Sequence, residues 1–181
     1  MKLQHRAAAL AVAMTATLSA IPFAGGSALP APETAQAFIP EHVQRLVSGP
    51  RFVLPMRAHP SYGDGLDSGR GHEGQDMFAP AGTPLVAIGD AVVLETGSDG
   101  GRGNYVSIHS AATGRTYNYF HMLGPALVRE GQKVRAGLKL GELGCTGSCW
   151  GDHLHFEVRE GRDPYGPVID PLPILKRLRP A

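Results

Sequence analysis

Short runs of strand-forming residues, separated by glycine-containing turns, recur along the chain between residues 83 and 159. Glycine, with 24 of 181 residues, and proline, with 15, are both abundant, and both favour turns over helix interiors. This pattern predicts a mainly β fold of antiparallel sheets with few short helices, and it argues against a helical bundle. The expected strands are 83–88 and 91–96 as a hairpin around Gly89-Asp90, 104–109 and 115–121 as a second pair, and then 133–134, 138–143 and 154–159.

The N-terminal segment has the features of an export signal. Lys2 and Arg6 precede an apolar, alanine-rich run over residues 7–24, and this order is typical of a secretory signal peptide. Ala35-Gln36-Ala37 has the small-x-small form of a cleavage site, so residues 1–37 are predicted to be removed. Two earlier triplets of the same form are alternative cleavage sites. A retained membrane anchor is disfavoured because the run is short for a membrane span.

The rest of the chain is predicted to be one exported domain with balanced charge. The whole chain has 17 basic and 16 acidic side chains, and loss of Lys2, Arg6 and Glu33 leaves 15 of each. This balance does not favour a broad basic surface for nucleic acid. We expect a secreted or periplasmic monomer without a stable membrane anchor after cleavage. The predicted layout is a lead-in at 38–51 with a short helical stretch at 41–47, a folded domain at 52–171, and a solvated basic tail at 172–181.

The last predicted strand carries two histidines on one face. Residues 153–158 read His-Leu-His-Phe-Glu-Val, and a strand sends successive side chains to opposite faces. His153, His155 and Glu157 therefore share one face, and the apolar side chains between them point into the core. The same rule, applied to the strand at 115–121, places three side chains on one face: Tyr117, Tyr119 and His121.

A second group of candidate metal ligands precedes these strands. His72 and Asp76 are four residues apart around a glycine. Imidazole nitrogen and carboxylate oxygen are good zinc ligands, and hydrolytic zinc sites use three protein ligands and leave one position for water. His72, Asp76 and either His153 or His155 would complete such a set, which leaves other histidines for proton transfer. Taken alone, each fragment is equally compatible with a polar sheet face or a solvated loop.

Several stretches, in this order along the chain, resemble the lysostaphin-type (LytM-like) zinc metallopeptidases. The resemblance extends from about residue 52 to residue 171. It implies a fold in which antiparallel sheets form an open groove, in agreement with the strand pattern. The stretches that carry it are 71–76, 79–87, 103–109, 114–121, 131–137, 144–147 and 153–158.

The resemblance also implies the roles of the candidate residues. His72, Asp76 and His155 are expected to bind one zinc ion per chain. His121 and His153 are expected to orient or deprotonate the attacking water and to stabilise the oxyanion. All five positions are filled, which disfavours a degenerate member of the family that has lost its metal. The chain departs from the family pattern at four positions, which leaves the shape of the substrate groove open: Gln75, Met122, Trp150 and Asp152.

The function implied by the resemblance is hydrolysis of peptide bonds in bacterial peptidoglycan by zinc-activated water. Export fits this substrate because the cell wall lies outside the membrane. Two alternatives remain open. One is a non-catalytic wall-binding or amidase-activating module, which would not need all five residues. The other is a secreted peptidase that acts on proteins, which would use the same site.

The remaining predictions concern the loop before the strand that bears His153 and His155, and one tyrosine. Cys145 and Cys149 are expected to form a disulfide, because export exposes them to an oxidising compartment and three intervening residues permit a tight loop. Trp150 is expected to border the groove and shape specificity, or else to cover this disulfide. Tyr119, on the strand at 115–121, is expected to border the groove and donate a hydrogen bond to the oxyanion.

Overall fold

The computed structural model of the protein describes residues 51–69 and 71–181. The signal peptide predicted at 1–37 and the helical stretch predicted at 41–47 lie outside the described residues. Among them, the regular secondary structure consists of antiparallel strands and one short helix, which confirms the mainly β prediction. In chain order the elements are β1 (Ser61–Tyr62), β2 (Gln75–Phe78), β3 (Pro84–Val86), β4 (Ala91–Asp99), β5 (Gly103–Ser110), β6 (Arg115–Met122), β7 (Lys133–Val134), β8 (Lys139–Glu142), β9 (His153–Glu160), β10 (Val168–Ile169) and α2 (Leu172–Leu175).

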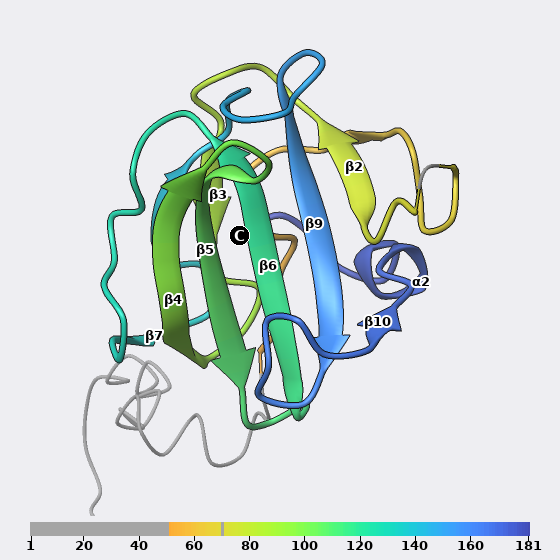
Figure 1. Ribbon diagram of the computed structural model, residues 1–181. Coiled ribbons are helices and arrows are strands. Elements are labelled where there is room, and N and C mark those ends of the chain that lie inside the picture. The colour runs from red at the N-terminus through yellow and green to blue at the C-terminus, as the bar shows by residue number, and fades with distance from the viewer. Residues whose placement is uncertain (1–50, 70) are drawn as a thin grey trace, which may run out of the picture. The chain divides into compact units, whose positions relative to one another are not determined.

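The described strands form two antiparallel sheets (Figure 1). The larger sheet has the strand order β1-β2-β9-β6-β5-β4-β7, and β10 pairs with β9 beside this path. The smaller sheet contains β3 and β8. β5 and β6 pair as predicted, with Ile108 opposite Tyr117. Because β2, β9 and β6 are neighbours, three segments that are distant in sequence meet at the centre of the larger sheet.

The hairpin predicted around Gly89-Asp90 does not form. β3 pairs with β8, whereas β4 pairs with β5 and β7. The residues after β3 bond elsewhere, since Ala87 N donates to Leu138 O and Ile88 O accepts from Val53 N. The turn therefore leads the chain from the smaller sheet into the larger one. The local sequence carries no sign of this because the actual partners are distant along the chain.

Apolar side chains from both sheets form one core. The strict alternation of β9 is confirmed, because its apolar side chains are fully buried while His155 faces the other side. Core residues contributed by the larger sheet include Met77, Val106, Ile108, Tyr117, Leu154, Phe156 and Val158, and those of the smaller sheet include Leu85 and Leu140.

β6 breaks the predicted alternation near its end. The register between β5 and β6 shifts between Asn104 and Val106, so that one residue of β5 faces two of β6 in a β-bulge. His121 takes a positive φ of 61°, a region in which histidine is enriched among non-glycine residues. As a result Phe120 and His121 both line the same cavity, whereas Tyr119 lies in the core. The prediction that both tyrosines of this strand share a face with His121 is wrong for this reason.

The C-terminal segment is part of the fold rather than a free tail. Leu175 of α2 is fully buried, and Leu54 N donates to Arg179 O. The basic residues of this segment therefore follow or flank a packed helix. Among the described residues, no helix has both the length and the apolar character needed to span a membrane.

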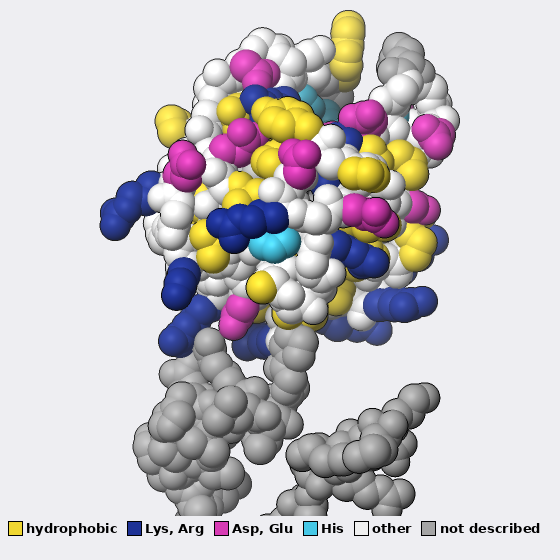
Figure 2. All heavy atoms as spheres, turned by 60° about the horizontal axis from the view of Figure 1, so that its bottom comes forward, with side chains coloured by type: hydrophobic (Ala, Val, Ile, Leu, Met, Phe, Trp, Pro, Cys, Tyr) yellow, Lys and Arg dark blue, Asp and Glu magenta, His cyan; other side chains and the backbone are white. Residues whose placement is uncertain are grey.

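The surface carries charges of both signs. On the face viewed in Figure 2, Asp and Glu side chains lie mainly toward the upper part of the described domain, and Lys and Arg side chains mainly toward the lower part. Neither sign dominates this face as a whole.

Candidate metal centre

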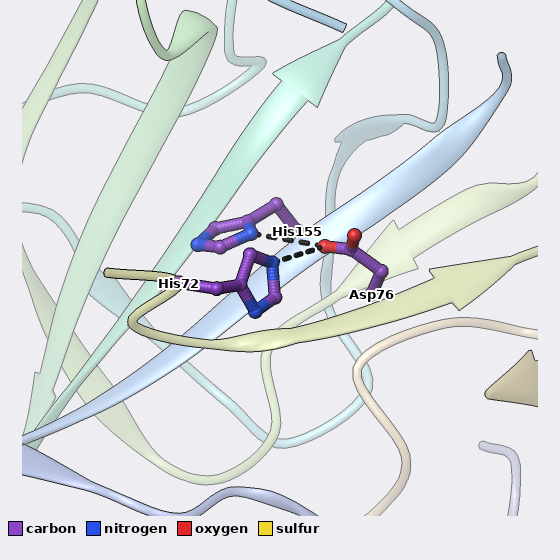
Figure 3. Close-up of side chains that lie close together, drawn as sticks. All are labelled: His72, Asp76 and His155. Atoms are coloured by element: carbon purple, nitrogen blue, oxygen red, sulfur yellow. Dashed lines mark hydrogen bonds and ion pairs between the residues drawn. The ribbon is translucent and has the colours of Figure 1, made fainter. Parts of the chain in front are cut away.

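His72, Asp76 and His155 come together where β2 and β9 pair (Figure 3). His72 lies in the loop before β2, and Asp76 on β2 is the direct partner of His155 on β9. One ligand atom of each residue lies within 4.8 Å of the others. Both imidazoles contact the same oxygen, Asp76 Oδ1, at 3.1 Å from His72 Nε2 and 3.0 Å from His155 Nδ1. The structure thus brings together three residues that the sequence analysis proposes as ligands.

In each of these two imidazoles, the ring nitrogen that faces away from Asp76 carries a proton. His72 Nδ1 lies 2.8 Å from Gly65 O, and a carbonyl oxygen only accepts, so Nδ1 carries the proton. His155 Nε2 lies 3.2 Å from Glu157 Oε1, a carboxylate oxygen that also accepts. In the neutral rings, His72 Nε2 and His155 Nδ1 then present lone pairs toward Asp76 Oδ1. Three electron-pair donors then lie close enough together to bind one cation.

The electrostatics of the three residues fit a metal such as zinc. Burial raises the pKa of Asp76, but the hydrogen bond from His155 and the nearby imidazoles outweigh this and lower it. Burial lowers the pKa of His155, but hydrogen bonds to Asp76 and Glu157 outweigh this and raise it to about 9. Without a metal His155 therefore keeps a proton at neutral pH, and a metal ion has to displace it. Two imidazole nitrogens and a carboxylate oxygen form a common ligand set for hydrolytic zinc.

A network of charged and polar side chains, buried except at Glu73, lies next to His155. Glu157 Oε2 accepts hydrogen bonds from Asn118 Nδ2 at 2.7 Å and from Arg159 Nη2 at 2.8 Å. Arg159 Nη2 also donates to Glu73 Oε2 in the loop before β2 at 2.7 Å. The network links β6, β9 and the metal loop, and it fixes the ring of His155. None of these residues has a role predicted from the sequence, although the alternation of β9 continues to Arg159 and is a usable signal.

His121 and His153 form a second pair beside the three candidate ligands. Their ring centroids are 4.9 Å apart, and His153 Nε2 lies 3.6 Å from Asp76 Oδ1. His121 Nδ1 faces Thr146 O at 2.9 Å, and His153 Nδ1 faces Gly151 O at 2.8 Å. Both Nδ1 atoms therefore carry protons, and in the neutral rings both Nε2 atoms are free to accept one. Burial lowers the pKa of His121, which favours its neutral form at neutral pH.

A groove of about 700 Å³ lies over both histidine groups. The ring of Phe120 stacks on His155 with centroids 5.5 Å apart. Trp150 lies at the groove with 90 % of its surface exposed, so its predicted position agrees with the structure, while its role stays a prediction. Phe120, Arg102 and Phe78 also line the groove and were not predicted from the sequence. The lining residues with large or charged side chains are Asp64, His72, Asp76, Phe78, Arg102, Phe120, His121, Trp150, His153 and His155.

Residues 70–167, more than half of the chain, match Peptidase family M23. The chain belongs to this family. Peptidoglycan DD-endopeptidase ShyC of Vibrio cholerae is 42 % identical over 103 residues, which are 57 % of this chain and 22 % of ShyC. DD-carboxypeptidase/endopeptidase Mpg of Neisseria meningitidis is 39 % identical over 117 residues, which are 65 % of this chain and 26 % of Mpg. The chain thus matches about a quarter of the length of these relatives.

Solved M23 structures have the same fold. The catalytic domain of lysostaphin from Staphylococcus simulans superposes with a TM-score of 0.59 at 31 % identity, over 65 % of this chain and 92 % of that domain. A zinc-containing peptidase from Vibrio cholerae gives a TM-score of 0.53 at 29 % identity, over 67 % of this chain and 39 % of that one. These similarities confirm the resemblance to lysostaphin-type peptidases and the fold expected from it.

Tyr119 of the M23 domain lies in the core, not in the groove. Its side chain is fully buried, and its hydroxyl accepts a hydrogen bond from Ile88 N and donates one to Val86 O, both at 3.0 Å. Burial raises the pKa of this phenol well above its usual range. The hydroxyl thus ties β6 to the end of β3 and has no proton left for an oxyanion. The prediction that Tyr119 borders the groove is wrong, and the bulge at His121 is the cause.

The loop between β8 and β9 is closed by its two cysteines. Cys145 and Cys149 are joined by a disulfide in the structure, with their Cα atoms 5.3 Å apart. Trp150 follows directly, and a side chain that exposes 90 % of its surface buries little against the disulfide. The alternative in which Trp150 covers the disulfide is therefore disfavoured.

Proposed function

We propose that this M23 domain acts as an exported zinc metalloendopeptidase that hydrolyses peptide bonds in the stem or cross-link peptides of peptidoglycan. One observation carries the proposal. The groove holds three residues whose ligand atoms lie close enough together to bind one metal ion, and beside them two further imidazoles whose Nδ1 atoms face carbonyl oxygens. A wall-binding module would need neither group. A hydrolase that activates water needs both.

The proposed mechanism assigns one task to each group of residues. His72 Nε2, His155 Nδ1 and Asp76 hold the zinc ion, one per chain. When bound, zinc lowers the pKa of a coordinated water toward about 7 and polarises the scissile carbonyl. Of the pair His121 and His153, one Nε2 accepts a proton from the attacking water and returns it to the leaving amine, while the other orients the water. An imidazole that has become protonated can also donate a hydrogen bond to the oxyanion.

The electrostatics of His121 suit the first of these tasks. Its low pKa, which burial causes, leaves Nε2 unprotonated before the reaction. Its Nδ1 proton stays bonded to Thr146 O, so the ring cannot turn away from the groove without losing that bond. His153 is held in the same way through Gly151 O.

The substrate class rests on the relatives. ShyC is named a peptidoglycan DD-endopeptidase and Mpg a DD-carboxypeptidase/endopeptidase. A peptidoglycan substrate lies outside the cytoplasmic membrane, in keeping with the signal peptide predicted at 1–37. We therefore place the mature protein in the periplasm or outside the cell, at the wall, as a monomer without a stable membrane anchor. An oxidising compartment of this kind also maintains the disulfide between Cys145 and Cys149.

The test is digestion of purified peptidoglycan by the zinc-loaded protein, with released fragments identified by mass spectrometry and new amino groups counted. We expect fragments cut in the peptide part, and none from His121→Ala loaded with the same amount of zinc. Unfolded protein is digested in parallel under the same conditions. Faster cleavage of that protein than of peptidoglycan would contradict the substrate. Full zinc loading without new amino groups from either substrate would contradict the activity.

A further inference from the structure

One short loop contacts both members of the second histidine pair. The segment from Cys145 to Gly151 joins β8 to β9, and its main chain provides the acceptors for the Nδ1 protons of His121 and His153. The two distances, 2.9 Å to Thr146 O and 2.8 Å to Gly151 O, are those of good hydrogen bonds. No side-chain group has to ionise for either bond to form.

These bonds determine which nitrogen of each ring can act on water. A neutral imidazole carries one proton, which can lie on Nδ1 or on Nε2. A carbonyl in front of Nδ1 retains the proton there, so Nε2 keeps its lone pair toward the groove. If the carbonyl moved away, the Nε2-protonated form would become accessible, and that form cannot accept a proton from water at Nε2.

The start of the loop is held in place by the Thr146 side chain. Its Oγ1 donates to Met122 O at 2.7 Å and accepts from Asn104 N at 2.8 Å. These two bonds tie the residue that faces His121 to the neighbouring ends of β5 and β6. A Cβ on Gly103 would lie 2.2 Å from Thr146 O, so only glycine permits this approach. Thr146 therefore fixes its own carbonyl through its hydroxyl.

The end of the loop is held differently. Ser148 N donates to Gly101 O at 3.0 Å, and the bond between Cys145 and Cys149 closes the turn two residues before Gly151. Thr146 lies near one end of this closed turn and Gly151 lies just beyond the other. Without the disulfide, the part of the loop that leads to Gly151 loses this constraint, while the two hydrogen bonds of the Thr146 hydroxyl remain.

We propose that this loop is a positioning element that sets the tautomer of both catalytic histidines. Thr146 is the positioning residue for His121, and the Cys145–Cys149 disulfide performs the same task for His153. The inference rests on the roles proposed above for these histidines. It assigns the loop an effect on turnover that is separate from metal binding, because none of the three metal ligands bonds to it.

The experiment reads the tautomers directly. Nitrogen NMR spectra of the imidazoles, recorded on the zinc-loaded full chain with labelled histidine, distinguish Nδ1-protonated from Nε2-protonated rings. We expect Nδ1-protonated His121 and His153 in the wild type. Thr146→Val should shift His121 toward the Nε2-protonated form and lower kcat by about tenfold or more, with KM and zinc content within about twofold. Thr146→Ser, which keeps the hydroxyl, should restore both.

The matched control is Thr116→Val. Thr116 Oγ1 also donates to a main-chain carbonyl, Gly161 O at 2.8 Å, but at the opposite end of β6. The Thr116→Val substitution removes a comparable hydrogen bond and should leave kcat and the tautomers of His121 and His153 unchanged. The double variant Cys145→Ser with Cys149→Ser should instead shift His153 and lower kcat, while His121 keeps its proton on Nδ1.

Two outcomes separate this inference from the proposed function. The first concerns the Thr146→Val variant and the cysteine-free variant. If both keep the wild-type tautomers and a kcat equal to that of Thr116→Val, the loop has no positioning role. Full zinc loading of the wild type without new amino groups from peptidoglycan or from unfolded protein would overturn the proposed function. The imidazole spectra do not depend on turnover, so the tautomers can be determined whether or not the protein hydrolyses peptidoglycan.

Discussion

The two histidine groups of the groove are held by different parts of the chain. His155 is fixed by side chains of the central sheet, through Glu157 and the arginine and asparagine behind it. His121 and His153 are fixed by main-chain carbonyls of a single loop. Two of the three metal ligands, Asp76 and His155, thus lie opposite each other on paired strands, whereas the ring orientation of the proton-transfer pair depends on a loop. We conclude that metal binding and turnover can be lost separately, and the following predictions test this.

The largest effect is expected from Asp76→Ala. Asp76 Oδ1 is the point at which both ligand imidazoles meet, so its loss removes the charge that holds the cation. We expect zinc content and peptidoglycan hydrolysis to fall together to background, as measured by metal analysis and fragment release on the same preparation. Full zinc content in this variant would remove Asp76 from the ligand set.

Glu157→Gln should weaken zinc binding without abolishing it. Groups that orient a metal ligand typically change affinity by about 10–100-fold when they are mutated. We expect a loss in this range by chelator competition, with kcat at saturating zinc close to wild type. Glu142→Gln is the matched control, because the Glu142 carboxylate forms an ion pair with Lys139 near the surface at 2.6 Å and does not line the groove. Equal zinc affinity in both variants would contradict the role of the buried network.

Zinc affinity should rise with pH. Proton and metal compete for His155 Nδ1, and hydrogen bonds to two carboxylates overcome the effect of burial and raise the pKa of this ring to about 9. Below that pH the ring is protonated in the metal-free protein, so the affinity should increase about tenfold per pH unit and level off near pH 9. Chelator competition between about pH 6.5 and 8.5 measures this slope. A flat profile would show that no proton is displaced from His155.

Trp150→Ala should have the smallest effect. The side chain borders the groove with 90 % of its surface exposed, so its removal costs little core packing. We expect the distribution of released wall fragments to change while zinc content and melting temperature stay at wild-type values. Leu127→Ala, which removes another exposed apolar side chain outside the groove lining, is the control. An unchanged fragment distribution with a lowered melting temperature would assign Trp150 a structural role.

The sequence predicted the parts of this site that follow from strict alternation. β9 obeys the period of two, so the shared face of His153, His155 and Glu157 was accessible from the sequence. β6 contains a bulge, and one extra residue reverses the facing of every side chain beyond it. Tyr119 was therefore assigned to the groove, although it bonds within the core.

Long-range pairing accounts for the rest of what was missed. Arg159 and Glu73 meet only because β9 lies beside the segment that leads into β2. In the same way, β3 pairs with β8 and not with the strand that follows it. Local patterns carry no record of such partners, because any of several strands offers the same main-chain groups. The resemblance to a known family supplied the ligand set that local patterns left open.

The most direct test compares two histidines on the same face of one strand. His153→Ala and His155→Ala remove the same side chain two residues apart on β9, and zinc content and fragment release are measured on the same preparations. The account predicts that His155→Ala lacks zinc and activity, whereas His153→Ala keeps about one zinc per chain and loses turnover by about 10²–10⁴-fold. Loss of zinc from His153→Ala, or full zinc in His155→Ala, would contradict the division between a metal site built into the sheet and a proton-transfer pair held by the loop.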